Sequence, residues 1–220
     1  MMNFFDLPES CYYGRLIPKN SFDKYTSTKQ KKMLTDVVSR MSWTHKLAPY
    51  TINLSGKHIV ELQVIQIELK RKKNIADILS VIDKSVPYSI VFVVKFGDEV
   101  FVSATVKHVN PNSTDSCVLD WTFKSDWFLI EDFEIVMNLR GSLDFVFFDL
   151  CKQLSPFASV AEDSLVDLVS KTSIFSKLDK EVKRLRAAVN SCKQFNRQVE
   201  LNLELLRAEE EMRNLVIEGN

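Results

Sequence analysis

The sequence has few of the residues and runs that mark disordered, membrane-spanning or secreted proteins. Its 220 residues include only 5 glycines and 6 prolines, too few for a low-complexity chain. It contains no run of about 18 apolar residues, so we expect no membrane-spanning helix. The opening MMNFFDLPESC lacks the basic start and the long apolar segment of a signal peptide. We therefore expect a globular protein of the cytoplasm.

Cysteine and histidine are too scattered to indicate a disulfide framework or a metal site. Cys11, Cys117, Cys151 and Cys192 show no CxxC spacing, and without a secretion signal we expect them to be reduced thiols. The three histidines lack partners at the spacing of zinc ligands. There is also no phosphate-binding glycine loop and no GxSxG motif. These absences favour a protein that is not an enzyme and that holds no metal or cofactor.

What the sequence does have is ample apolar material and an uneven distribution of charge. Hydrophobic residues make up 45% of the chain and include 15 Phe, enough for a packed core. Residues 1–110 hold 16 Lys and Arg against 10 Asp and Glu, a net charge of +6, whereas residues 111–220 hold 13 against 19, a net charge of −6. This asymmetry indicates either nucleic acid at one end and a protein partner at the other, or an ordinary solvated surface.

Hydrophobic periodicity predicts a mixed α/β (α+β) fold. Ser27 and Gln30 form a capping-box pattern that predicts the start of the first helix. Further helices are expected at residues 75–85, 142–154 and 161–171. We expect a small mixed sheet of about five strands, at residues 50–54, 58–70, 89–96, 100–109 and 118–124. The predicted organisation is a mixed α/β domain over residues 1–130, a helical connector over 131–172 and a long helical arm over 173–220.

The strand predicted at residues 58–70 has an irregular pattern. Its apolar residues change parity between Val64 and Ile65. A bulge at this point would restore one polar face and one apolar face. The alternatives are two short strands, or a single strand that is buried on both sides.

The end of this strand contains the tripeptide Glu68-Leu69-Lys70, which resembles the ExK half of the PD-(D/E)xK nucleases. That resemblance implies Mg²⁺ held by acidic residues and a lysine that helps to position the attacking water. The preceding segment YTINLSG, however, has no Asp for the first metal ligand. Neither Glu61, on the same strand, nor Asp36, on a helix, is an evident substitute. A metal-dependent nuclease using Glu68 and Lys70 is therefore the alternative function.

Two basic clusters are candidates for contact with nucleic acid. One is the run Lys70, Arg71, Lys72 and Lys73, which can contact phosphates without sequence preference, although such runs are as often solvated loops. The other is formed by Lys29, Lys31 and Lys32, close to a helix N-terminus where the helix dipole disfavours cations. This second cluster either faces phosphates or has arisen by chance.

The C-terminal arm, residues 174–216, contains no Pro or Gly and has apolar residues at spacings of mostly three and four. We expect a single helix of about 42 residues and roughly 60 Å, too long to bury its apolar stripe on its own body. The alternative, packing against residues 142–154 or 161–171, would cover only about 20 Å for each helix. The candidate partner-binding residues are Leu178, Val182, Leu185, Val189, Phe195, Val199, Leu203 and Leu206.

Three distinctive strings carry a resemblance to a known family: WTHKLAPYTINL (43–54), VELQVIQIELK (60–70) and CKQFNRQVELNLEL (192–205). Together they resemble a bacterial family of unknown function, number 4391 in the domain-of-unknown-function series, over nearly the whole chain. The family offers no established catalytic residues. The resemblance implies a small component encoded with helicases and DNA methyltransferases, in anti-phage defence or restriction-like gene sets.

Together these observations favour a non-catalytic accessory subunit. We expect its arm to dock on a helicase, on a DNA methyltransferase or on a second copy of the chain, and its basic half to be able to contact DNA. A nucleic-acid-binding module without a protein partner is a third possibility.

Overall fold

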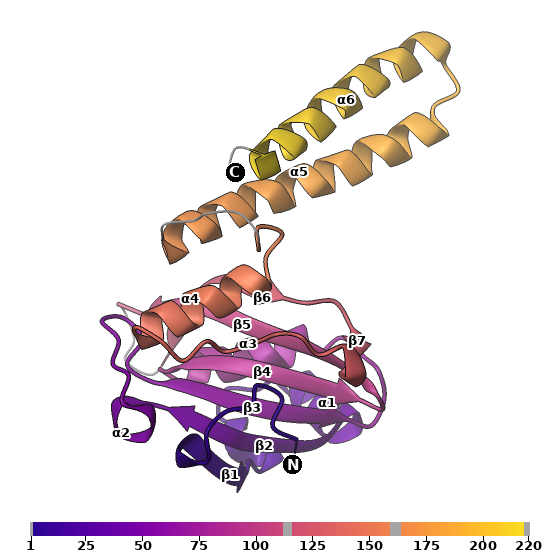
Figure 1. Ribbon diagram of the computed structural model, residues 1–220. Coiled ribbons are helices and arrows are strands. Elements are labelled where there is room, and N and C mark those ends of the chain that lie inside the picture. The colour runs from indigo at the N-terminus through magenta and orange to yellow at the C-terminus, as the bar shows by residue number, and fades with distance from the viewer. Residues whose placement is uncertain (1, 112–115, 159–163, 218–220) are drawn as a thin grey trace. The chain divides into compact units, whose positions relative to one another are not determined.

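The computed structural model describes residues 2–111, 116–158 and 164–217. The chain divides into two compact units, Met1–Leu154 and Ser155–Asn220, which we call the body and the hairpin unit. The body is a mixed sheet with helices on both faces, and the second unit is a pair of long helices (Figure 1). The predicted mixed α+β fold is therefore confirmed. Among the described residues no helix is long and apolar enough to span a membrane.

The sheet of the body has seven strands, in the order β1-β2-β3-β4-β5-β6, with β7 paired to β5. Among the described strands only β3 and β4 run parallel, with α3 connecting them, and the other neighbouring pairs are antiparallel. The strands are β1 (Tyr12–Leu16), β2 (Val38–Leu47), β3 (Leu62–Leu69), β4 (Ser89–Phe96), β5 (Glu99–Val109), β6 (Cys117–Lys124) and β7 (Phe128–Leu129).

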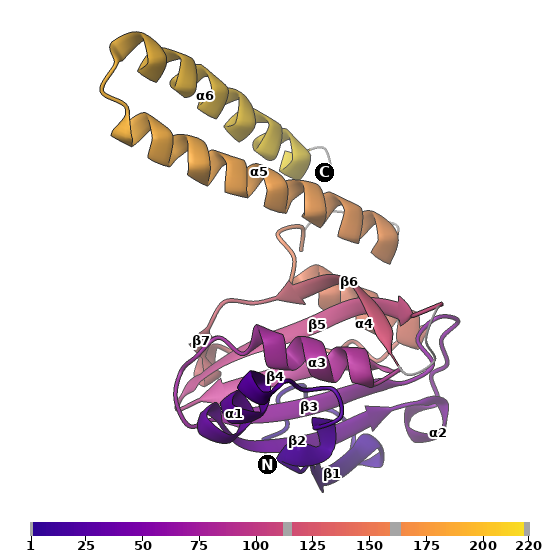
Figure 2. The same ribbon diagram turned by 180° about the vertical axis from the view of Figure 1, so that it is seen from behind.

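The helices of the body cover both faces of the sheet. Figures 1 and 2 show α1 and α3 on one face and α4 on the other. The capping box predicted at Ser27 and Gln30 is confirmed at the start of α1. The helices of the chain are α1 (Thr28–Val37), α2 (Pro49–Ile52), α3 (Ala76–Ser85), α4 (Leu143–Gln153), α5 (Leu165–Ser191) and α6 (Phe195–Ile217), and short 3₁₀ turns lie at Glu9–Cys11, Lys19–Phe22 and Ile130–Asp132.

The strand predicted at residues 50–54 is wrong. Pro49 stands at the first helical position, where its fixed φ favours a helix, and starts the short helix α2. The strand that pairs with β3 is instead β2, which begins directly where α1 ends. Val38 is already extended, with φ −84° and ψ 126°. This strand was not predicted because its register shifts between Trp43 and His45, so apolar and polar residues do not alternate along it.

The bulge predicted within residues 58–70 is also wrong. β3 pairs with β4 without interruption from Leu62 to Glu68. Val64 and Ile65 point to opposite faces, and both are buried. The irregular register belongs to β2, opposite these two residues. The alternative prediction, a strand buried on both sides, is therefore correct.

The core between the sheet and the pair α1 and α3 is the larger described cluster. Its side chains include Leu34 of α1, Ile78 of α3, and Ile67 and Phe92 of the central strands, each at most 2% exposed. Full burial of one such side chain is worth about 1.5–3 kcal/mol. This packing holds α3 against the centre of the sheet and leaves β5 and β6 beside it to form one wall of a cavity.

The single long helix predicted for the arm is wrong, because the chain turns at residues 192–194. α5 and α6 have 27 and 23 residues and pack together as a helical hairpin. Cys192 is extended, with φ −75° and ψ 124°, and its N–H donates to Ala188 and Val189 at the end of α5. The helix predicted at 161–171 is not a separate helix, because residues 165–171 form the first turns of α5. Residues 161–163 lie outside the described part of the chain.

Candidate functional site

Helix α6 carries two different apolar faces. One face is covered by α5, and there Leu201 and Ala208 are 7% and 8% exposed. The other face remains open to solvent. We call its four side chains the outer stripe: Phe195, Val199, Leu203 and Leu206, which are 75%, 44%, 52% and 61% exposed. Their spacings of four, four and three place them along one side of the helix over about 16 Å.

The eight residues predicted to bind a partner fall into two groups. Val182, Leu185 and Val189 lie in the seam between the two helices, where they pack against α6, and Leu178 is half-buried. The four residues of the outer stripe make up the second group. The chain itself thus covers most of the α5 residues and leaves the α6 residues available.

Charged side chains of the hairpin form ion pairs outside the outer stripe. Arg186 of α5 and Glu209 of α6 form an ion pair of 2.6 Å across the two helices. Arg197 and Glu200, at the start of α6, pair at 2.7 Å. An apolar centre with a polar rim is the usual composition of a protein-binding surface.

Glu68 and Lys70, the candidate nuclease residues, lie at the C-terminal end of the central strand β3, among basic residues. The cross-strand neighbours of Glu68 are Arg40 on β2 and Lys95 on β4, where a second metal-binding carboxylate would be needed. Lys70 donates from its Nζ to the carbonyl oxygen of Thr35 at 2.8 Å. Within residues 2–111, 116–158 and 164–217 no three His, Cys, Asp or Glu side chains come close enough to hold a metal. The geometry therefore gives the nuclease alternative no support.

The predicted basic residues lie in two segments of the chain, the first turns of α1 and the segment at and after the end of β3. Lys29, Lys31 and Lys32 are exposed in the first turns of α1, where Lys31 faces Asp23 at 3.5 Å. Lys70 contacts the last turn of the same helix, through Thr35. Arg71 is exposed beyond β3.

The other two members of the basic run, Lys72 and Lys73, line a cavity beside α3. Lys72 also pairs with Glu99 at 2.6 Å and lies 5.0 Å from the centre of the Trp127 ring. Nucleic-acid contact through this run would therefore place a phosphate at the entrance of that cavity.

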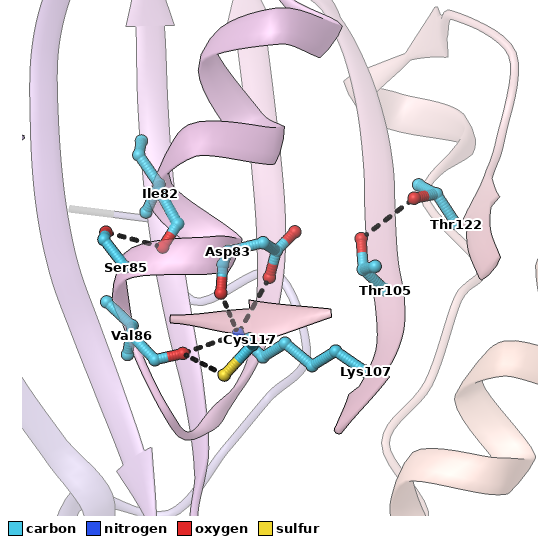
Figure 3. Close-up of polar contacts among 8 residues, drawn as sticks. All are labelled: Ile82, Asp83, Ser85, Val86, Thr105, Lys107, Cys117 and Thr122. Atoms are coloured by element: carbon cyan, nitrogen blue, oxygen red, sulfur yellow. Dashed lines mark hydrogen bonds and ion pairs between the residues drawn. The ribbon is translucent and has the colours of Figure 1, made fainter. Parts of the chain in front are cut away.

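The body also buries an ion pair that the sequence did not reveal. Lys107 Nζ lies 3.2 Å from Asp83 Oδ1, and it donates to the carbonyl oxygens of Asp83 at 2.7 Å and Val86 at 2.9 Å (Figure 3). Both side chains are at most 2% exposed. Burial raises the pKa of Asp83 and lowers the pKa of Lys107, and the attraction between the two charges opposes both shifts. The sequence contained one sign of this burial. Lys107 lies an even number of residues after the buried Phe101 on β5, so both side chains point to the same face of the sheet.

Comparison with known proteins gives a family but no activity. No curated protein and no solved structure matches the chain. A family model matches residues 5–212, which is nearly the whole sequence. The chain therefore belongs to the domain-of-unknown-function family DUF4391.

Proposed function

We propose that this protein is a non-catalytic accessory subunit that docks on a larger cytoplasmic protein through the outer stripe of α6. The observation that carries the proposal is the exposure of Phe195, Val199, Leu203 and Leu206 after α5 has covered the opposite face of the same helix. Apolar anchors at such spacings are typical of a helix that binds in a groove of its partner.

The size of the stripe favours a groove over a second copy of this chain. Four partly exposed apolar side chains fall short of the about 800 Å² that a stable interface buries on each partner. Two identical convex helices would contact each other mainly along their stripes. A groove would also contact the polar side chains on either side of the stripe and so reach the required area.

The partner we propose is a helicase or a DNA methyltransferase of an anti-phage defence or restriction-like gene set. This part rests on the family resemblance. The basic residues of the accessory subunit are our candidates for contact with the DNA of such an enzyme, and contact through Lys70, Arg71, Lys72 and Lys73 would be sensitive to salt.

The experiment is purification of the full-length tagged chain from its native cells, with mass spectrometry of the bound proteins. The variant Leu203→Glu with Leu206→Glu places two charges on the outer stripe. The control variant, Ser170→Glu with Asn190→Glu, adds the same charges at exposed polar positions of α5. Circular dichroism of both variants checks that the hairpin stays folded.

We expect a helicase or methyltransferase to be recovered with the wild type and the control, and at least tenfold less of it with the stripe variant, since anchor residues contribute about 2 kcal/mol or more each. Full recovery with the stripe variant would exclude the stripe as the dock. A homodimer that the stripe variant dissociates, with neither enzyme recovered, would show that the partner is a second copy.

A further inference from the structure

The cavity beside α3 has no part in the docking proposed above. Its volume is about 370 Å³, within the usual range of about 300–1,000 Å³ for small-molecule sites. One wall is a single face of α3 that runs from Ala76 to Asp83, a distance of about 10 Å. The facing wall is formed by inward-pointing residues of β5, namely Phe101, Ser103 and Thr105.

One end of the cavity is cationic and aromatic. Lys73 and Lys124 line it, both exposed, and in the described part of the chain neither has a carboxylate within ion-pair distance. Beside them the rings of Phe101 and Trp127 meet edge to face, with centroids 4.7 Å apart. Lys124 Nζ lies 5.3 Å from the centre of the Phe101 ring, and Lys72 Nζ lies 5.0 Å from that of Trp127. Ammonium groups beside aromatic walls suit an anion joined to a planar ring.

The other end of the cavity accepts hydrogen bonds. The Asp83 carboxylate lies there, 1% exposed, and it already accepts from Lys107. A carboxylate has about four acceptor positions, and Lys107 and the Thr105 hydroxyl already face this one, so the remaining positions are those open to a ligand. The hydroxyls of Thr105 and Thr122 lie nearby, 3.1 Å from each other (Figure 3). Ring N–H, amino or sugar hydroxyl groups are the donors that this end could bind.

We propose that this cavity binds a nucleotide unit. The phosphate lies at Lys73 and Lys124, the base lies along Phe101 and Trp127, and donor groups of the base or sugar point toward Asp83. The length of the wall accommodates these three parts end to end. The unit is either a free mononucleotide or one nucleotide of a single strand, because both present the same chemistry to the cavity.

The test is isothermal titration of the full-length protein with GMP, AMP, inorganic phosphate and a short single-stranded oligonucleotide, all at one salt concentration. The variant Lys73→Ala with Lys124→Ala removes the phosphate contacts. Ser80→Leu fills the cavity from α3 without disturbing the Asp83 pair, and Lys84→Ala, on the same helix but outside the cavity, is the control.

We expect at least one nucleotide or the oligonucleotide to bind, with about tenfold weaker affinity in the double-lysine variant and in Ser80→Leu and unchanged affinity in Lys84→Ala. Binding of a mononucleotide identifies a free nucleotide as the ligand, and binding of the oligonucleotide alone identifies a strand. The proposal is overturned if neither binds, if inorganic phosphate binds as tightly as the nucleotides, or if Ser80→Leu leaves the affinity unchanged. None of these results depends on the outer stripe, so this proposal and the docking proposal fail separately.

Discussion

The central strands of the body and helix α6 of the hairpin unit bury their side chains to different depths. In the body, a central side chain such as Phe92 is completely inaccessible, and even the charged Asp83 is 1% exposed. In the hairpin, the best-covered residues of α6 are still 7% and 8% exposed, and the outer stripe is open. A sheet covered by helices on both faces shelters its central strands from every direction, whereas two helices can cover only one side of each other. The central strands of the body are therefore fully sheltered, while α6 keeps apolar side chains open to solvent.

The largest expected effect on stability concerns the ion pair that is buried in the body. Replacing Lys107 with Met should lower the free energy of unfolding by about 3–5 kcal/mol, because it leaves the Asp83 carboxylate buried without its cation. Urea denaturation measures the change. The double variant Lys107→Met with Asp83→Leu should recover most of the loss, and a single-variant cost below about 1 kcal/mol would contradict the burial of this pair.

The second prediction compares the two faces of α6. Leu201→Ala should destabilise the hairpin by about 2–3 kcal/mol, because it opens the seam against α5. Leu203→Ala, only two residues away but 52% exposed, should change stability by less than about 0.5 kcal/mol. Hydrogen exchange of the α6 amides reports both values. Equal effects of the two substitutions would remove the distinction between the seam and the outer stripe.

The third prediction concerns a contact that fixes α4 to the segment before β3. Asp144, in the first turn of α4, accepts hydrogen bonds from the backbone N–H groups of Lys57, His58 and Ile59, the last two at 2.9 Å. Burial opposes its ionisation, but these three donors outweigh burial and hold the pKa of Asp144 below its usual value. Asp144→Ala should therefore cost about 2 kcal/mol of stability at neutral pH.

The pH dependence of this contact follows from the lowered pKa. The stabilisation is present above the unfolded pKa of about 4 and is lost as the pH falls through the lower pKa of the folded state. Denaturation curves from pH 6 to pH 2 should therefore converge for wild type and Asp144→Asn at the acidic end. A constant difference between them across that range would mean that the carboxylate charge contributes nothing.

The smallest effect is expected at the surface of the hairpin. Arg186→Ala removes the interhelical pair with Glu209, whose side chains are 60% and 27% exposed. Exposed pairs contribute about 0.2–1 kcal/mol, so thermal denaturation should show only a small shift. That shift should shrink further at high salt, because salt screens exposed charges. A loss comparable to that of Leu201→Ala would show that charge, and not apolar packing, holds the hairpin.

Local signals in the sequence found several elements of this fold. The pair Ser27 and Gln30 correctly predicted the start of α1, and the continuous apolar run at Ser89–Phe96 correctly predicted β4. β1 was missed because it is short and largely exposed, so it shows no apolar alternation. The turn at residues 192–194 was missed because it contains neither Gly nor Pro, the residues on which turn prediction depends.

The sequence likewise indicated some features of the candidate sites and missed others. The residues of the outer stripe stood in the periodic pattern of the arm, but so did Val182 and Leu185, which the hairpin covers. Lys72 and Lys73 were visible as part of a basic run. Their association with Lys124 and Trp127 around one cavity was not, because these residues come from different elements.

The sequence by itself determined the membership of the family, the mixed composition of the fold and the amphipathic character of the C-terminal segment, because each depends on residue identity and short-range periodicity. Only the tertiary structure decided which apolar residues remain exposed and which charges face each other inside the body. Asp83 and Lys107 are 24 positions apart, and their pairing depends on how α3 lies across β5. An apolar stripe becomes a binding surface or a core according to what folds against it, and residue spacing alone does not contain that information.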